Sequence, residues 1–249
     1  MTRHEVDERS LHPDLRGFDY QVTERGRVRH APPEMVDRAF EIFAEELEPL
    51  RTAGKMGGVL LQFPPFFTAI PSHRAENLAY IEQAAEKLAG TPVFVEFRHP
   101  SWVEERELPH TLRFLVDRGL SYVSVDAPHA PGSSAMPPVS AATAPWSYVR
   151  FHGRNREMWG ARTATAADRF DYLYEPDELA EWAGPIRALA DETERTWVMF
   201  NNCKYDYAPR NAREMAAVLG DIVAPRRGGT PTGEPADVPP EPGQLELGV

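Results

Sequence analysis

The sequence is poor in the features that would place the protein in a membrane, in an oxidising compartment or on nucleic acid. Its 249 residues include one cysteine, Cys203, which excludes an intramolecular disulfide. No apolar run approaches the roughly 20 residues that span a bilayer. The charged N-terminus lacks the apolar core of a signal peptide. The net charge of −11 disfavours unspecific binding of nucleic acid. We therefore expect a cytoplasmic protein with no membrane partner, whose domain does not bind nucleic acid.

The signature motifs of several enzyme classes are also missing. The sequence contains no GxSxG nucleophile elbow, no GxxxxGK phosphate loop, no CxxC pair and no dinucleotide fingerprint. Its histidines are not spaced as HxH or HxxxH, so we expect no metal site, and no cofactor is identified. A reaction can be inferred only from polar groups elsewhere in the chain.

Most of the chain alternates strand-like with helix-like segments. Strands are predicted over Phe18–Thr23, Gly57–Phe63, Pro92–Phe97, Leu120–Val125, Trp146–Phe151 and Trp197–Phe200. Helices are predicted over Glu34–Leu50, His73–Leu88, Leu108–Arg118, Pro176–Ala190 and Pro209–Leu219. This alternation predicts an α/β fold with a parallel sheet covered by helices. We favour a TIM-barrel-like parallel (β/α) barrel, incomplete at its N-terminus, over a doubly wound sheet, because polar groups end several separate strands.

Composition divides the chain into three parts. Residues 1–16 are polar and irregular, and residues 17–223 form the expected barrel domain. Residues 224–249 hold six of the 24 prolines and few apolar groups, which predicts a disordered tail. The tail ends in QLELGV (Gln244–Val249), which weakly resembles the peptides that dock on bacterial sliding clamps. We expect that the tail binds a protein partner.

Three segments begin with apolar residues and end in polar ones: FVEFRHPSW from Phe94, YVRFHGRN from Tyr148 and MFNNCKYDYAPRNA from Met199. In parallel barrels the active-site residues lie at the carboxyl ends of the strands. The three segments therefore predict a functional site at that end of the barrel. The candidate catalytic residues, able to hold or move a proton, are Glu96, His152 and Asp126. The candidate substrate-binding residues are Arg98, His99, Arg150, Arg154, Asn155, Asn201, Asn202 and Tyr207. The structural alternative is that Arg150 only pairs with Glu96 or Asp126.

At these residues the chain resembles the YecE-like family, domain-of-unknown-function family 72. The resemblance rests on LLQFPPFF, VEFRHPSW, YVRFHGRN and FNNCKYDYAPRNA, in order between about Gly17 and Gly220. It implies a TIM-barrel-like fold and supplies no reaction. Family members usually open with a strand like GTSGW, which is absent here. The resemblance therefore predicts a barrel with unpaired edges, and leaves open whether the true start lies upstream.

Three functions compete at this point. The first is an enzyme, a hydrolase or lyase acting on a small anionic, phosphorylated or sugar-like compound at the barrel mouth. The second is a non-catalytic accessory protein in nucleic-acid metabolism that acts through the tail peptide. The third is a fragment without independent function.

Overall fold

A five-stranded parallel sheet organises the molecule, in a computed structural model that describes residues 6–29, 31–128, 136–159 and 166–224. The strand order is β4-β5-β6-β7-β8. The strands are β4 (Val59–Gln62), β5 (Val93–Glu96), β6 (Ser121–Asp126), β7 (Trp146–Phe151) and β8 (Arg195–Phe200). The prediction of an α/β fold with a parallel sheet is confirmed. The predicted tail, from residue 225 onward, lies outside the described residues.

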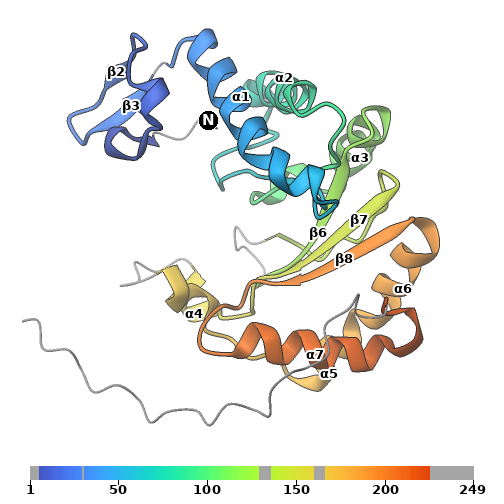
Figure 1. Cartoon of the computed structure of the whole chain (residues 1–249). Coiled ribbons are helices and arrows are strands. Elements are labelled where there is room, and N and C mark those ends of the chain that lie inside the picture. The colour runs from blue at the N-terminus through green and yellow to red at the C-terminus, as the bar shows by residue number, and fades with distance from the viewer. Residues whose placement is uncertain (1–5, 30, 129–135, 160–165, 225–249) are drawn as a thin grey trace, which may run out of the picture.

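Helices connect the strands and cover the sheet, as Figure 1 shows. They are α1 (Pro33–Thr52), α2 (Pro71–Lys87), α3 (Leu108–Asp117), α4 (Arg156–Trp159), α5 (Pro176–Glu181), α6 (Ala183–Glu192) and α7 (Tyr207–Leu219). Short 3-10 helices are η1 (Glu8–Ser10), η2 (Pro13–Leu15), η3 (Pro100–Trp102), η4 (Ala166–Phe170) and η5 (Gly220–Ile222). Proline opens α1, α2 and α5, at a position where its missing N–H loses no helical bond.

The single helix predicted over Pro176–Ala190 is broken into α5 and α6 at Trp182. Pro185 has no N–H for the Glu181 carbonyl, so a regular helix cannot pass through this point. The break lets the Trp182 indole turn toward the sheet, where it donates a hydrogen bond to Asp126. The Trp182 side chain therefore links the break between α5 and α6 to the sheet.

The helix-covered face of the sheet carries two apolar clusters. Val95 and Tyr122 pack with Ile81 of α2 and Leu115 of α3. Val149 and Phe151 belong to a second cluster with side chains of α5, α6 and α7. Both clusters follow from period-two alternation, which gives each strand one row of side chains for the helices.

The sheet is strongly curved. Gln62 on β4 and Arg150 on β7 are three strand spacings apart, about 14 Å along the sheet. Their side chains nevertheless form a hydrogen bond of 2.5 Å across the concave face. At the other end of the strands, a Cβ placed on Gly57 would lie 3.2 Å from the Trp197 ring. This curvature is that of a TIM-barrel-like wall, although in the described residues the wall is not closed, and β4 and β8 are its edges.

The concave face is apolar near the amino ends of the strands and polar at their carboxyl ends. Phe94 and Val123 form its buried centre, with Tyr148 and Trp197 packed against them. Beyond this layer come Glu96 and the other charged groups of the candidate site. The aromatic layer lies beneath these polar groups. We call this carboxyl-end part of the concave face, with Glu96, Arg98, Arg150, His152 and Asn201, the basin.

A small antiparallel sheet precedes the parallel one. It joins β1 (Val6–Asp7), β3 (Arg27–Arg29) and β2 (Gln21–Val22) in that order, and lies next to α1 in Figure 1. The strand predicted at Phe18–Thr23 is therefore shorter and belongs to this sheet rather than the parallel one. Gly26, with φ 70°, closes a tight turn that pairs β2 with β3 locally. Where the sequence indicates an irregular segment at residues 1–16, the described part forms β1, η1 and η2.

Candidate functional site

Four of the sequence-predicted residues meet at the carboxyl ends of β5, β7 and β8. Glu96 ends β5, Arg150 lies on β7, His152 follows β7 and Asn201 follows β8. The parallel register and the alternation of side chains turn all four to the concave face. Glu96 and His152 are fully buried. The structure thus brings together residues that lie up to 105 positions apart in the chain.

These four side chains form a closed ring of hydrogen bonds. Arg150 donates from Nη1 to Glu96 Oε2 at 2.6 Å and from Nη2 to Asn201 Oδ1 at 3.1 Å. Asn201 Nδ2 lies 3.1 Å from His152 Nδ1, and His152 Nε2 lies 2.9 Å from Glu96 Oε1.

The proton positions in the ring follow from its chemistry. A guanidinium can only donate, so the Asn201 oxygen accepts and its amide donates to His152 Nδ1. His152 therefore carries its proton on Nε2 and gives it to Glu96. The hydrogen bonds run in one direction from Arg150 through Asn201 and His152 to Glu96. Glu96 also accepts directly from Arg150, so as a carboxylate it accepts two hydrogen bonds within the ring.

The charge states agree with this pattern. Burial alone would raise the pKa of Glu96, but the hydrogen bond from His152 and the Arg150 charge outweigh burial and lower the pKa. Burial lowers the pKa of His152, despite the hydrogen bond to Glu96, so the imidazole is neutral near pH 7. The ring therefore holds one negative carboxylate, one positive guanidinium and a neutral imidazole.

Arg98 adds a second positive charge with no carboxylate of its own. Its Nη1 lies 3.7 Å from Glu96 Oε1, which is longer than a hydrogen bond. Within the described residues, no acceptor lies within hydrogen-bond distance of Arg98. About 17% of its side chain is exposed, and its guanidinium lies 5.1 Å from the centre of the Trp159 ring. The basin thus has two guanidinium groups for one carboxylate and carries an excess positive charge.

Aromatic rings border the basin on the side of His152. Trp159 of α4 and Phe170 of η4 lie 6.0 and 5.8 Å from the imidazole, measured between ring centres. Gly153 makes the turn from β7 toward α4 with φ 87°, and a Cβ there would come within 2.8 Å of Tyr172. The turn thus requires glycine, and it places Trp159 against both Arg98 and His152.

The structure separates Asp126 from the ring. Asp126 ends β6 on the helix-covered face, where Arg154 contacts it through Nε and Nη2 at 2.7–3.2 Å. Tyr174 donates its hydroxyl to Asp126 at 2.5 Å, and the Trp182 indole donates at 2.7 Å. Burial and the Asp126 charge raise the pKa of Tyr174, so this hydroxyl remains a donor. Arg154 also contacts Glu181, so neither it nor Asp126 reaches the basin unpaired.

The other predicted residues hold loops and helix ends in place. His99 accepts a hydrogen bond from the Ser101 N–H and caps η3. Asn155 accepts from the Met158 N–H at the start of α4. Asn202 is fully buried and donates to the Tyr172 carbonyl. Tyr207 begins α7 and packs on Tyr205.

The sequence-based site lacked Gln62 and Phe170 of the basin, and Tyr174 and Trp182 next to Asp126. Gln62 has a usable signal, since it is the one polar residue in the apolar run of β4. Tyr174 and Trp182 have none, because they come from the loop and the helix break that follow β7. In the described residues, no three His, Cys, Asp or Glu side chains group as metal ligands would. None of the described helices combines the length and apolar character needed to cross a bilayer.

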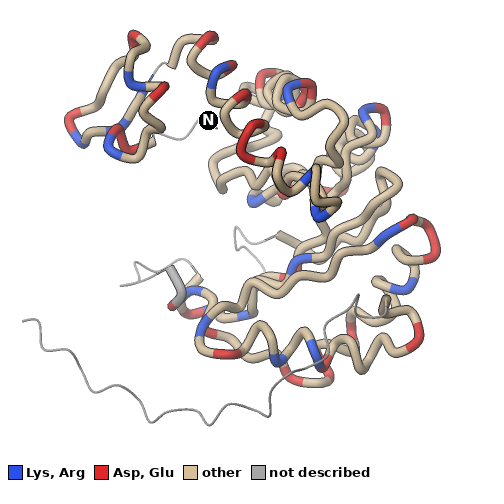
Figure 2. Tube along the Cα trace, in the orientation of Figure 1, with Lys and Arg blue, Asp and Glu red and all other residues tan. Residues whose placement is uncertain are grey.

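Charges outside the basin are mixed in sign. Lys and Arg are interspersed with Asp and Glu over the helices and the small sheet (Figure 2). The excess positive charge of the basin is therefore a local feature.

Comparison with known proteins gives consistent matches. The family described as "Protein of unknown function DUF72" matches residues 17–234. The UPF0759 protein YunF of Bacillus subtilis (strain 168) is 30% identical over 213 residues, which cover 82% of this chain and 72% of YunF.

Two solved structures have similar folds. A DUF72 family protein of Enterococcus faecalis V583 has a TM-score of 0.67 and 29% identity, covering 74% of this chain and 66% of that one. A DUF72 family protein of Thermotoga maritima MSB8 has a TM-score of 0.65 and 32% identity, covering 74% and 65%. The chain thus spans just under two thirds of the length of these structures.

Proposed function

The chain belongs to the DUF72 family, and from that premise we propose that its basin binds a small anionic substrate through Arg98 and Arg150. The substrate class is a phosphorylated or carboxylate-bearing compound, and the reaction is that of a hydrolase or lyase. One observation carries the proposal: Arg98 is largely buried, yet in the described residues it has no hydrogen-bond acceptor. A largely desolvated guanidinium whose N–H groups have no acceptor is costly, and an anionic ligand supplies the missing acceptors.

The ring supplies the proton chemistry of the proposed reaction. Glu96 is ionised and receives the Nε2 proton of His152 in a hydrogen bond. If Asn201 turns toward the ligand, Nδ1 of His152 becomes a free base next to the bound anion. The imidazole can then take a proton from water or substrate, and Glu96 stabilises the imidazolium that forms. Arg150 holds Glu96 in place and shares its charge with the ligand.

The binding half of the proposal is tested by thermal shift with inorganic phosphate, glucose 6-phosphate and glucose. We expect the two phosphates to raise the melting temperature and the neutral sugar to leave it unchanged, because only anions occupy the basin. Arg98→Ala should abolish the shift.

Arg195→Ala is the matched control, because Arg195 also stacks on tryptophan and also lies on the sheet, at the opposite end of its strands. A phosphate shift that survives Arg98→Ala, or is equally lost in Arg195→Ala, would contradict the proposed anion site.

The catalytic half requires a separate measurement on any phosphate ester that binds. Release of inorganic phosphate should stop in His152→Gln, whose amide still donates to Glu96, while the thermal shift persists. Equal turnover in this variant would contradict the role of His152 and leave the anion site standing.

A further inference from the structure

The edge strand β8 offers unpaired backbone groups. The Asn201 N–H donates to the Phe151 carbonyl, and the register pairs Phe200 with Phe151. Since backbone groups alternate in direction along a strand, the N–H and C=O groups of Thr196, Val198 and Phe200 point away from β7. In the described residues no strand lies on that side. Open edges of this kind accept an extended segment.

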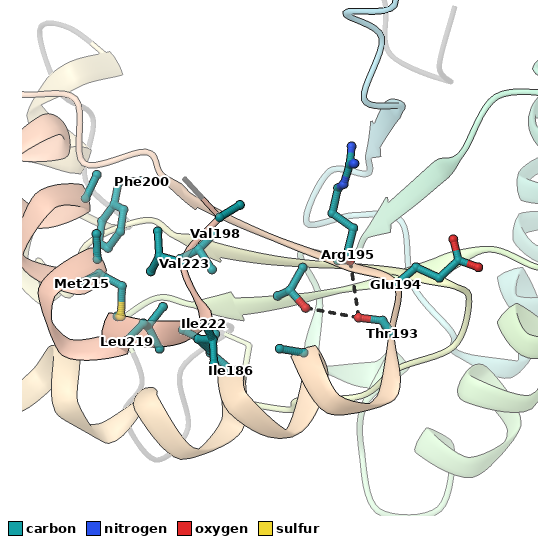
Figure 3. Close-up of a pocket in the computed structure, with 15 residues that line it drawn as sticks. Ile186, Thr193, Glu194, Arg195, Val198, Phe200, Met215, Leu219, Ile222 and Val223 are labelled. Carbon is teal, nitrogen blue, oxygen red and sulfur yellow. Dashed lines mark hydrogen bonds between the residues drawn. The ribbon is translucent and has the colours of Figure 1, made fainter. Parts of the chain in front are cut away.

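An apolar pocket of about 510 Å³ lies beside this edge. It opens between β8 and the helices α6 and α7. Figure 3 shows Met215, Leu219, Ile222 and Val223 gathered on one side of β8, with Arg195 projecting from the other. The pocket therefore suits a strand that bonds to β8 and turns alternate apolar side chains toward the helices.

The described chain ends in this pocket. Ala224 lines it, and 25 further residues follow. The last six, QLELGV, place Leu245, Leu247 and Val249 at alternate positions, with Glu246 and Gly248 between them. The 20 residues from Pro225 to Gln244 reach about 25 Å as a flexible chain, and β8 is about 20 Å long. The segment can therefore reach any part of the edge.

We propose that Gln244–Val249 pairs with β8 of its own molecule as an added strand. Leu245, Leu247 and Val249 then fill the pocket between β8 and α7. Alternation turns Glu246 to the concave face, on the side where Arg195 projects, so the charges are complementary. Gly248 places no side chain against the tryptophans of that face. This inference concerns the edge of the sheet and is independent of the anion site.

Amide hydrogen exchange on the full chain, resolved by residue, tests the proposal. In the unchanged protein we expect slow exchange at Thr196, Val198 and Phe200. In Leu245→Asp/Leu247→Asp, exchange at these three amides should become at least tenfold faster, because burying two carboxylates in the pocket is unfavourable. Trp197 and Met199 bond to β7, so their amides should exchange at the same rate in both proteins.

Glu246→Gln is the matched control, since it changes the same segment without touching its apolar face, and should keep the protection. Equal exchange in the unchanged protein and the double variant would overturn the proposal. Protection that rises with protein concentration would also overturn it, because the edge would then be covered by a second copy of the chain.

Discussion

Glu96 and Asp126 end neighbouring strands and are both almost fully buried, yet they project to opposite faces of one sheet. Asp126 is surrounded by donors from the loop after β7, the loop before α5 and the helix break at Trp182. Its partner Arg154 is shared with two further carboxylates, Glu178 and Glu181. Glu96 is surrounded by two guanidinium groups, neither of which has another carboxylate within 4 Å in the described residues. Around Asp126 three carboxylates share one guanidinium, so negative charge is in excess. Around Glu96 two guanidinium groups share one carboxylate, so positive charge is in excess.

The difference separates a structural carboxylate from one that belongs to the proposed ligand site. Around Asp126 every donor has an acceptor, so the cluster joins the β7 end to α5 and presents no spare donor to an anion. Around Glu96 one guanidinium is left over, and it borders the open side of the curved sheet. Burial alone does not distinguish the two carboxylates, whereas the balance of donors and acceptors does.

Asp126→Asn should produce the largest loss of stability. The amide places N–H groups against donors from Tyr174, Trp182 or Arg154, and the first two are buried with no access to water. We expect the free energy of unfolding to fall by about 3–5 kcal/mol, as when one partner of a buried pair is removed. Urea unfolding measures this loss. The phosphate-induced thermal shift should remain, and its disappearance would contradict the separation of the two clusters.

Glu96→Gln should cost less stability and should strengthen anion binding. One donor–donor contact replaces a hydrogen bond in the ring, which we expect to lower the free energy of unfolding by about 2–3 kcal/mol. The cost is smaller than for Asp126 because Arg98 and Arg150 keep about 17% and 15% of their side chains exposed, so part of each group can still reach water. Phosphate should bind more tightly once the competing carboxylate is gone. Weaker phosphate binding in this variant would contradict the charge balance inferred for the basin.

The fold was largely predictable because its signals are local. Apolar runs of four to six residues predicted β4 to β8, and helical periodicity predicted α1, α2, α3 and α7. The break at Trp182 was missed because a helical stripe continues through it, although Pro185 within the predicted helix indicates such a break. The strand at Phe18–Thr23 was assigned to the wrong sheet because the turn at Gly26 pairs it locally. The curvature that lets Arg150 reach Gln62 is a property of the whole sheet, so it cannot be predicted from the sequence of any one segment.

The candidate site was predictable in part for a related reason. That Glu96, Arg150, His152 and Asn201 end strands can be read from the sequence, and parallel pairing then brings strand ends together. Which face Asp126 occupies cannot be read in the same way. It depends on the register between β5 and β6, where Phe94 pairs with Ser121, and a shift of one residue would turn Asp126 into the basin. Register is decided by packing against the helices, which no single strand encodes.

The last predicted effect is a pH dependence that arises from two groups of the basin. The pKa of His152 is lowered below 6.5 by burial, so below pH 6.5 the unfolded chain binds a proton that the folded chain does not. Glu96, whose pKa is lowered below 4.5, acts in the same direction at lower pH. Stability is therefore complete above pH 6.5 and falls as the pH drops, by at most about 1.4 kcal/mol per pH unit for each group.

His152→Gln should remove the upper part of this fall, between pH 6.5 and 4.5, and leave the part below pH 4.5. The glutamine amide can still donate to Glu96, so the carboxylate keeps its partner while the titrating imidazole is gone. Urea unfolding at a series of pH values measures the slope. His110→Gln, at the exposed surface of α3, removes an imidazole outside the basin and serves as the control. An unchanged slope of the unfolding free energy between pH 6.5 and 4.5 in His152→Gln would mean that the imidazole is protonated in the folded protein over this range. The Asn201 amide would then have to turn its oxygen, instead of its N–H, toward His152 Nδ1.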